Sequence, residues 1–353
     1  MLTSALAFIV VFSVVVLVHE AGHFLSARQA GIVIEEFGIG YPPRVATLFV
    51  RNGVEYTLNA IPLGGFVRLR GEEDPSEPGS LASKSAWIRI RTIAAGVVMN
   101  VLLAAVLLTG VYLIGEQVMQ GRVAIESVLP GTPADEAGLW PGDVFVTING
   151  QQMQDLAEVS ARLRGLAGQE VELVLEREGE PYTVRVTPRL DPPPGEGALG
   201  ISITWAPGAT ATTVRYPLGE ALYRGVADTV MMIGAMLAGF AQMFRGGLRP
   251  GDITGPVGIF QISGAVAQSG LTSLMTWTAF LSLNLFIINL LPIPGLDGGR
   301  IAFILLEKIR GRRIAPQREA MAHVIGILII LALTIVVSYF DVVRLLSGGS
   351  VLP

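Results

Sequence analysis

Cysteine is absent from this sequence of 353 residues, so disulfides and thiolate metal sites are excluded. Charge is also scarce, because Asp, Glu, Lys and Arg make up 15% of the chain and the apolar residues 51%. An average soluble protein carries about 25% charged residues. The net charge of −4, without a broad basic face, excludes nucleic acid as a partner. Histidine occurs three times, which leaves few ligand sets for a transition metal.

Long apolar runs explain the missing charge and indicate a chain that spans the lipid bilayer, since a spanning helix needs about 20 apolar residues. We expect four transmembrane helices, at residues 1–30, 92–115, 275–300 and 324–346. No Lys or Arg precedes the first run, so it is interpreted as a retained span rather than a signal peptide. Residues 224–244 are long enough to span, but Asp228 and Gln242 favour a helix at the membrane surface. Both possibilities stay open for this segment.

Basic residues are concentrated in two connections, 28–91 and 307–319. By the positive-inside rule, both connections face the cytoplasm. The two termini and the acidic region 116–220 then lie on the outer side of the membrane. Residues 301–323 form the second cytoplasmic connection in this scheme.

The cytoplasmic segment 31–91 is rich in β-forming residues, and Asn52-Gly53 is a strong hairpin signal. We expect a small membrane-associated β-sheet there, followed by an acidic loop. Short strands and turns in residues 116–190 predict one extracytoplasmic α+β domain. Residues 191–274 are predicted to hold a proline-rich linker and the amphipathic helix. The fold class is therefore a polytopic α-helical membrane protein with a β-loop and one outer domain.

The strongest chemical signal is His19-Glu20-Ala21-Gly22-His23 in the first span. Residues at i and i+4 share one helix face, so both imidazoles can bind one Zn²⁺. Zinc lowers the pKa of a bound water to about 7, and Glu20 is placed to act as the general base. The same five-residue pattern also arises by chance, but ionisable residues inside a membrane span usually mark function.

A catalytic zinc needs a third protein ligand and one open position. Asp297 is the best candidate, because it follows a proline-broken segment at the end of the third span. Irregular backbone at membrane depth is tolerated where it lines a cavity or is buried in protein. Asp297 can alternatively cap the next helix, and His323 is the rival ligand. In a four-span chain the first and third spans run in the same direction, so Asp297 meets His19 and His23.

The pair of motifs, HEAGH and NLLPIPGLDGG, resembles the site-2 protease family of intramembrane metalloproteases, in the group of the regulator of sigma-E protease. The likeness covers nearly the whole chain and includes PLGGFV at 62–67 and GPVGI at 255–259. The resemblance implies a protein of the bacterial inner or plasma membrane, with zinc held by His19, His23 and Asp297 and with Glu20 as base. It also implies that Asn289 and Asn284 hold the substrate backbone, although an Asn in a span can simply bond a neighbouring helix.

The resemblance implies further that the β-sheet pairs with an unwound substrate through Gly64, Gly65 and Phe66, by β-augmentation. A self-contained sheet is the alternative. The outer domain resembles a permuted PDZ domain, with residues 121–124 expected along its peptide groove. In the family such a domain binds a trimmed substrate end or excludes bulky substrates, and the sequence leaves both open.

Two features depart from the family pattern. The sigma-E protease has two PDZ modules and this chain has one, and the 96–100 segment lacks a family proline, which leaves the role of Asn100 open. The implied activity is hydrolysis of single-pass membrane proteins, such as an anti-sigma factor or a remnant signal peptide, after a first cut by an upstream site-1-type protease. An inactive PDZ scaffold and a metal-ion transporter are the alternatives.

Overall fold

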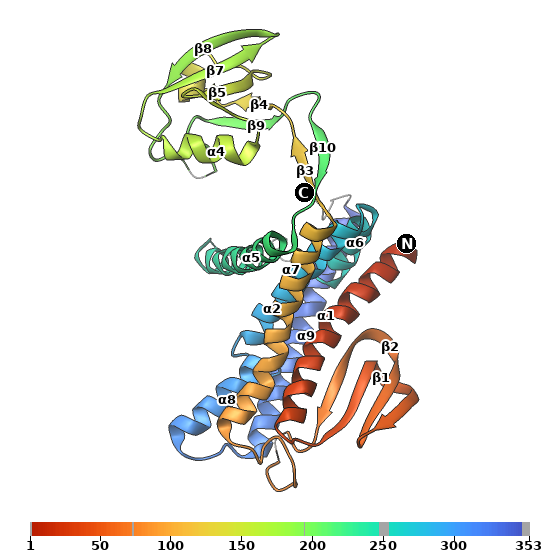
Figure 1. The fold of residues 1–353 in the computed structure, drawn as a ribbon. Coiled ribbons are helices and arrows are strands. Elements are labelled where there is room, and N and C mark those ends of the chain that lie inside the picture. The colour runs from red at the N-terminus through yellow and green to blue at the C-terminus, as the bar shows by residue number, and fades with distance from the viewer. Residues whose placement is uncertain (1, 73, 194, 247–253, 348–353) are drawn as a thin grey trace. The chain divides into compact units, whose positions relative to one another are not determined.

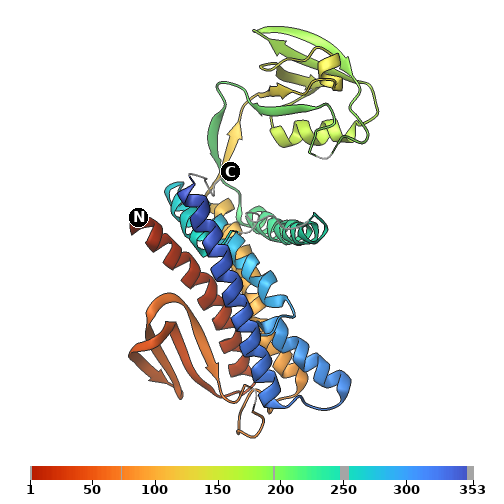
Figure 2. The same ribbon diagram turned by 180° about the vertical axis from the view of Figure 1, so that it is seen from behind.

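The computed structural model describes residues 2–72, 74–193, 195–246 and 254–347, with residues 243–246 described by their backbone alone. Two compact units make up the chain. The helical unit comprises Met1–Gly115 and Arg215–Pro353, and the β-rich unit comprises Glu116–Val214. Figure 1 labels the elements of both units, and Figure 2 shows them from behind.

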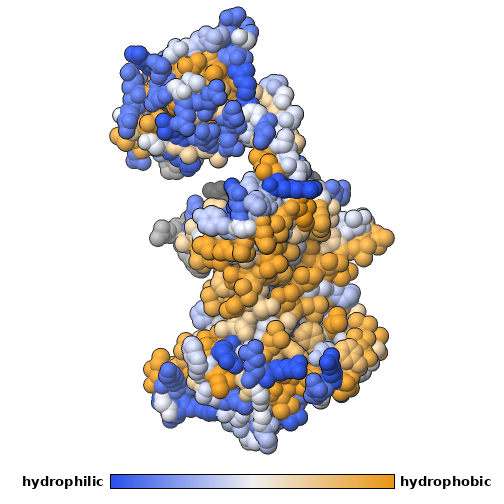
Figure 3. All heavy atoms as spheres, in the orientation of Figure 1, coloured by the Kyte–Doolittle hydropathy of each residue, from blue (hydrophilic) through white to orange (hydrophobic). Residues whose placement is uncertain are grey.

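The helical unit contains seven helices in its described part: α1 (Leu2–Gln29), α2 (Ala86–Ile114), α5 (Leu218–Gly246), α6 (Pro256–Gln268), α7 (Leu271–Leu290), α8 (Asp297–Arg310) and α9 (Pro316–Leu346). Of the described helices, five are long and apolar enough to cross a membrane, namely α1, α2, α5, α7 and α9. Figure 3 shows apolar residues covering the middle of this unit, with hydrophilic residues toward the end that holds β1, β2 and α8. The expected polytopic membrane architecture is confirmed.

Small residues allow the long helices to approach closely. A Cβ on Gly22 of α1 would lie 2.4 Å from the carbonyl oxygen of Ala95 in α2. Further along α2, Ala104 and Leu108 are buried against Ala279 and Leu283 of α7. Close backbone approach of this kind is the usual basis of helix association in lipid, where burying apolar surface gains little.

Helix α5 differs from the other long helices in its direction. Figures 1 and 2 both show it crossing α2 steeply instead of running alongside it. Gly225 permits this crossing, because a Cβ there would lie 2.4 Å from Oγ1 of Thr109 in α2. The Tyr112 hydroxyl of α2 donates a hydrogen bond to Asp228, so the acidic residue within α5 has a partner.

The predicted β-sheet next to α1 is present, as a hairpin of β1 (Ile34–Arg51) and β2 (Val54–Leu69). Asn52 and Gly53 join the strands with φ of 53° and 81°, the positive values that a type I′ hairpin turn requires. The hairpin is folded on itself, because Phe37 is paired with both Tyr56 and Val67. Residues 65–69 therefore form the edge of the sheet that lies nearest α1.

The β-rich unit contains β3 (Glu116–Gln120), β4 (Val123–Val128), α3 (Pro133–Glu136), β5 (Val144–Ile148), β6 (Gln151–Gln152), α4 (Leu156–Gly165), β7 (Val171–Arg177), β8 (Glu180–Val186), β9 (Ile201–Trp205) and β10 (Thr210–Val214). Its main sheet has the order β8-β7-β5-β4-β9, while β3 pairs with β10 in a separate ladder. Phe145, Leu173 and Val159 of α4 lie in a fully enclosed apolar core.

Several boundaries differ from the predicted ones. The outer domain was expected to end at residue 190, but β9 and β10 extend the β-rich unit to Val214, because alternate apolar residues of β9 pair with β4. Helix α6 lies within the predicted 191–274 linker, of which residues 194 and 247–253 are outside the described part. The predicted 301–323 connection is mostly helical, with α8 ending at Arg310 and α9 beginning at Pro316.

A buried carboxylate joins two strands of the β-rich unit. Asp143 is fully buried, and it accepts hydrogen bonds from Arg177 at 2.7 and 2.8 Å and from the Tyr182 hydroxyl at 2.6 Å. Burial disfavours the charged form, but these bonds outweigh it and hold the pKa of Asp143 below its ordinary value. The stability that this pairing contributes is present at neutral pH and is lost as the pH falls below about 4.

Replacing Asp143 by Ala should destabilise the β-rich unit by about 2 kcal/mol, because Tyr182 and the partly exposed Arg177 lose their shared hydrogen-bond acceptor. Hydrogen exchange of β5 and β7 amides in the full chain measures this change. The control is Glu172→Ala, which removes an exposed ion pair with Arg185 at 3.6 Å and should cost less than about 1 kcal/mol. Equal protection of β5 and β7 in the two variants would contradict the assignment.

Candidate metal centre

Three side chains from two distant parts of the chain converge inside the helical unit. Nε2 of His19 lies 3.1 Å from Nε2 of His23, and the two nitrogens lie 3.0 and 3.3 Å from Oδ2 of Asp297. Zinc–ligand bonds of about 2.0–2.1 Å place the ligand atoms of a tetrahedral site about 3.3 Å apart. Oδ2 of Asp297 is buried and has no hydrogen-bond partner. This donor set fits a divalent metal such as zinc, and it is the set expected from the sequence.

The other ring nitrogen of each histidine is held by α2. Nδ1 of His23 lies 3.0 Å from the carbonyl oxygen of Thr92, so it carries the proton and leaves Nε2 free for a metal. Nδ1 of His19 lies 3.2 Å from the side-chain amide of Asn100, whose Oδ1 is buried without a partner. Turning that amide over lets Oδ1 accept the Nδ1 proton and satisfies both groups.

Asn100 is therefore a site residue whose role sequence reasoning left open. It is fully buried in α2, and a hydrogen-bonded amide behind a metal-binding histidine fixes the tautomer and orientation of the ring. The only sequence signal was a polar residue in an otherwise apolar span, and a polar residue there commonly marks function.

Glycine makes room for the two histidines. A Cβ on Gly96 of α2 would lie 2.4 Å from Nε2 of His23 and 2.9 Å from Cε1 of His19. Any larger residue at position 96 would therefore press on the ring atoms that form the donor set. This requirement could not be predicted, because it depends on a contact between two helices.

Asp297 is the first residue of α8 and follows a tight loop of residues 291–296. Glycine is needed after it, because a Cβ on Gly298 would lie 2.3 Å from the Leu291 carbonyl oxygen, and one on Gly299 would lie 2.2 Å from the Ile293 carbonyl oxygen. The loop thus folds back over the end of α7 and turns Asp297 toward α1. Leu296, and not Asp297, occupies the N-cap of α8, so the capping alternative does not describe this carboxylate.

Glu20 lies between the histidines and the edge of the β-sheet. Its Oε2 accepts a hydrogen bond of 3.0 Å from the Val67 backbone N–H. Next to Val67, a Cβ on Gly65 would meet Leu17, and one on Gly64 would meet Val16 of α1. The glycine pair therefore lets the edge of β2 lie against the α1 turn that precedes Glu20.

The remaining predicted residues are not all next to the cluster. Asn289 lies beside the cluster, with Nδ2 3.5 Å from Nε2 of His19. Phe66 covers Gly38 of the sheet, where a Cβ would lie 2.3 Å from its ring. Asn284 is one and a half turns before Asn289 on α7, and its amide donates to the Phe280 carbonyl of its own helix. The rival His323 is outside the donor set, and its Nδ1 accepts from the Gly295 N–H.

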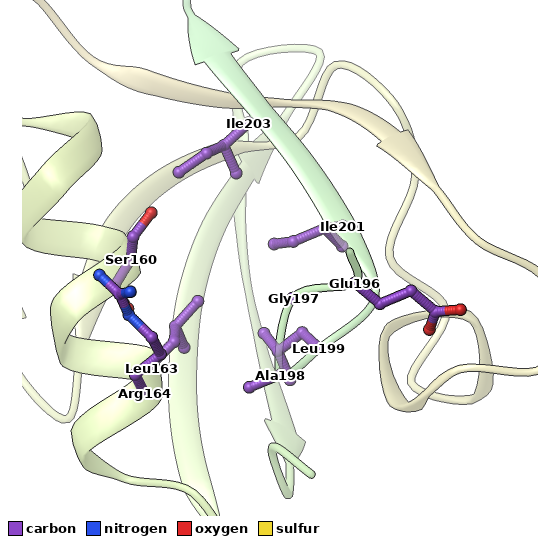
Figure 4. Close-up of a pocket in the computed structure, with 9 residues that line it drawn as sticks. All are labelled: Ser160, Leu163, Arg164, Glu196, Gly197, Ala198, Leu199, Ile201 and Ile203. Carbon is purple, nitrogen blue, oxygen red and sulfur yellow. The ribbon is translucent and has the colours of Figure 1, made fainter. Parts of the chain in front are cut away.

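A hollow lies in the β-rich unit, between the free edge of β9 and helix α4. It has a volume of about 310 Å³ and is lined by residues of α4, the 196–199 loop and β9. Figure 4 shows Ile201 and Ile203 of β9 directed across it toward Leu163 of α4. Residues 121–124, which were expected along a peptide groove, do not line this hollow. The strand β4 lies between β5 and β9, so it has no open edge.

Gly96→Ala should abolish zinc binding, because the new methyl group would occupy the position 2.4 Å from Nε2 of His23. Metal content of the purified protein measures the effect. Gly110→Ala is the matched control on the same helix, since a Cβ there meets only the flexible end of Met275, at 2.5 Å. If the Gly96→Ala protein retained a full equivalent of zinc, the packing of α2 against the two rings would be wrong.

The sequence matches the model of peptidase family M50 over residues 7–333. The chain is 29% identical to the regulator of sigma-W protease RasP of Bacillus subtilis, over 97% of this chain and 99% of the relative. It is 30% identical to the zinc metalloprotease RasP of Geobacillus kaustophilus, over 97% of this chain and 98% of the relative. A third relative, the zinc metalloprotease RasP of Bacillus licheniformis, is 30% identical over 98% of this chain and 100% of the relative.

These matches confirm the family resemblance seen in the sequence. Zinc as the cofactor and hydrolysis of peptide bonds as the reaction follow from the family, and the cluster of His19, His23 and Asp297 fits that metal. The chain belongs to peptidase family M50, the site-2 protease family of membrane zinc metalloproteases.

Proposed function

We propose that this protein is an endopeptidase that cuts single-span membrane proteins within the bilayer, with zinc held by His19, His23 and Asp297. The observation that carries the proposal is the convergence of three donor atoms within 3.3 Å of one another, two from the apolar helix α1 and one from the first residue of α8. When bound, zinc acts as a Lewis acid on the peptide carbonyl and on the attacking water. Three protein ligands would leave a bound zinc one open position for that water.

Glu20 takes the proton from the attacking water and passes it to the leaving amine. Its carboxylate is oriented by the Val67 N–H, at 3.0 Å, so one oxygen is held while the other is available to the water. Thr92 and Asn100 hold the imidazoles in the tautomer with Nε2 directed at the metal. Asn289 holds the substrate backbone next to His19, as its 3.5 Å contact with that ring supports.

The substrate binds as an extended strand along the edge of β2. A helix hides its peptide bonds, so the scissile segment must unwind before hydrolysis, and β-augmentation supplies main-chain partners for it. Gly65, Phe66 and Val67 form the part of this edge nearest Glu20. A substrate strand that pairs along this edge lies beside the base.

The chain crosses the membrane four times, with the active site toward the cytoplasm. Asp297 follows the C-terminal end of α7 and meets the C-terminal half of α1, so these two helices run in the same direction. If α5 also spanned, α7 would run the opposite way unless α6 crossed too. Helix α6 has 13 residues, which reach only about 20 Å of a core about 30 Å thick. The steep crossing of α5 over α2 supports the same count.

The β-rich unit is a permuted PDZ domain that binds the trimmed end of the substrate outside the membrane. The free edge of β9 and the facing helix α4 support strand addition in the hollow between them. A free end implies an earlier cut by another protease. The regulatory name of the Bacillus subtilis relative supports a substrate that controls a sigma factor, and a remnant signal peptide offers the same single span.

Glu20→Gln should lower cleavage of a single-span substrate in liposomes by about 10²–10⁴-fold, because a general base contributes that much. Zinc content should stay at one equivalent, since the ligands are untouched. Glu35→Gln is the control, because Glu35 pairs with Arg70 in the sheet, and it should cleave normally. Undiminished cleavage by the Glu20→Gln protein would refute the base, and absence of zinc from the parent would refute the whole proposal.

Ile203→Asp should weaken binding of free-carboxylate hexapeptides ending in Ala, Val or Leu by at least about tenfold, since a charge would replace an apolar wall of the hollow. Fluorescence anisotropy with the full chain measures the affinity, and amidated peptides should bind more weakly than free ones. Thr204→Asp is the control, because Thr204 is exposed and alternates with Ile203 along β9. Equal affinities for free and amidated peptides would argue instead for a size filter.

A further inference from the structure

The third histidine of the chain contacts the loop that carries Asp297. His323 of α9 is buried, with 7% of its surface exposed, and its Nδ1 lies 2.8 Å from the Gly295 backbone nitrogen. A backbone N–H can only donate, so Nδ1 is the acceptor and carries no proton. Gly295 lies two residues before Asp297, in the tight loop between α7 and α8.

Helix α9 is pressed against this loop by close backbone contact. A Cβ on Gly326 would lie 1.8 Å from the Pro294 carbonyl oxygen, so no other residue fits at that position. Gly295 has a φ of +98°, and a Cβ there would lie 3.2 Å from the Ile327 backbone nitrogen. The hydrogen bond from Gly295 to His323 therefore forms in a contact that leaves the loop little freedom.

The imidazole ring is itself held on its other sides. Phe303 of α8 packs edge-on against it, with ring centroids 5.4 Å apart. Nε2 lies 3.9 Å from Oε1 of the buried Glu319, one turn earlier on α9. Both side chains line a cavity of about 10 Å³, roughly the space that one bridging water needs. The ring thus joins α8, α9 and the loop at one point.

We propose that His323 is a positioning residue for the metal centre, which acts through Gly295 to hold the Asp297 loop in the conformation that binds zinc. The inference rests on the proposed ligand set. Within the described residues, the group able to hold a metal consists of His19, His23 and Asp297, so His323 acts from outside the coordination sphere. Hydrogen bonds behind a ligand typically change metal affinity by about 10–100-fold when they are removed.

The test measures zinc affinity of the full chain in detergent, by competition with a chromophoric chelator, in the Glu20→Gln background. His323→Phe keeps a ring against Phe303 but removes the acceptor, and it should raise the zinc dissociation constant by about tenfold or more. His323→Asn places an amide oxygen near the former Nδ1 and should restore affinity to within about threefold of the parent. Val324→Ala, at a neighbouring residue that is 56% exposed, is the control and should bind zinc like the parent.

Each result decides between a positioning role and simple packing. Weak zinc binding by His323→Phe together with recovery by His323→Asn supports the proposal, provided that both metal-free proteins melt near the parent temperature. Parent-like zinc affinity of His323→Phe overturns it, as does equal weakness of the two variants. If the Glu20→Gln parent binds zinc and the chain with Glu20 intact cleaves, parent-like zinc affinity of His323→Phe removes this inference alone. A parent that binds no zinc removes the proposed function as well.

Discussion

The approach of two imidazole nitrogens and one carboxylate oxygen to within 3.3 Å is the interaction on which the helical unit depends. It joins residues that are more than 270 positions apart, and it requires α1 and α7 to run in the same direction with their ends at the same level. Only an odd number of membrane-spanning helices between them meets this requirement. The metal centre therefore constrains the course of every helix between α1 and α7, including the direction of α5.

Polar groups placed among apolar helices are stable only if each has a partner. Here α2 supplies the partners of both rings, through the Thr92 carbonyl and the Asn100 side chain. The β-hairpin supplies the partner of Glu20 through the Val67 N–H. Two elements that bind no metal thus determine which ring nitrogens face the donor cluster and where the Glu20 carboxylate points. This division explains why a sheet is packed against the first helix of a membrane protein.

Much of the site could be predicted because its signals are local. His19 and His23 are one helical turn apart, and the prolines before Asp297 mark an irregular loop at the end of a span. The hairpin turn at Asn52-Gly53 follows from the conformational preferences of those two residues alone. The roles of Gly96 and Asn100 could not be predicted, since each exists only after α1 and α2 have packed together. The strand β9 was missed for the same reason, because its partner β4 lies far away in the sequence and a proline-rich segment precedes it.

The glycines at the packing contacts around the metal centre share one physical cause. In lipid, helices gain little from burying apolar surface, so their association depends on close packing and hydrogen bonds. Added Cβ atoms on Gly22 and Gly326 would collide with backbone atoms of the facing segment at 2.4 and 1.8 Å. Backbone atoms cannot relieve a clash by changing rotamer, as a side chain can. Such contacts therefore fix helix positions more tightly than side-chain packing does. Ligand atoms that must stay within a few tenths of an ångström of a tetrahedron are thus held by the least adaptable contacts that a membrane protein can form.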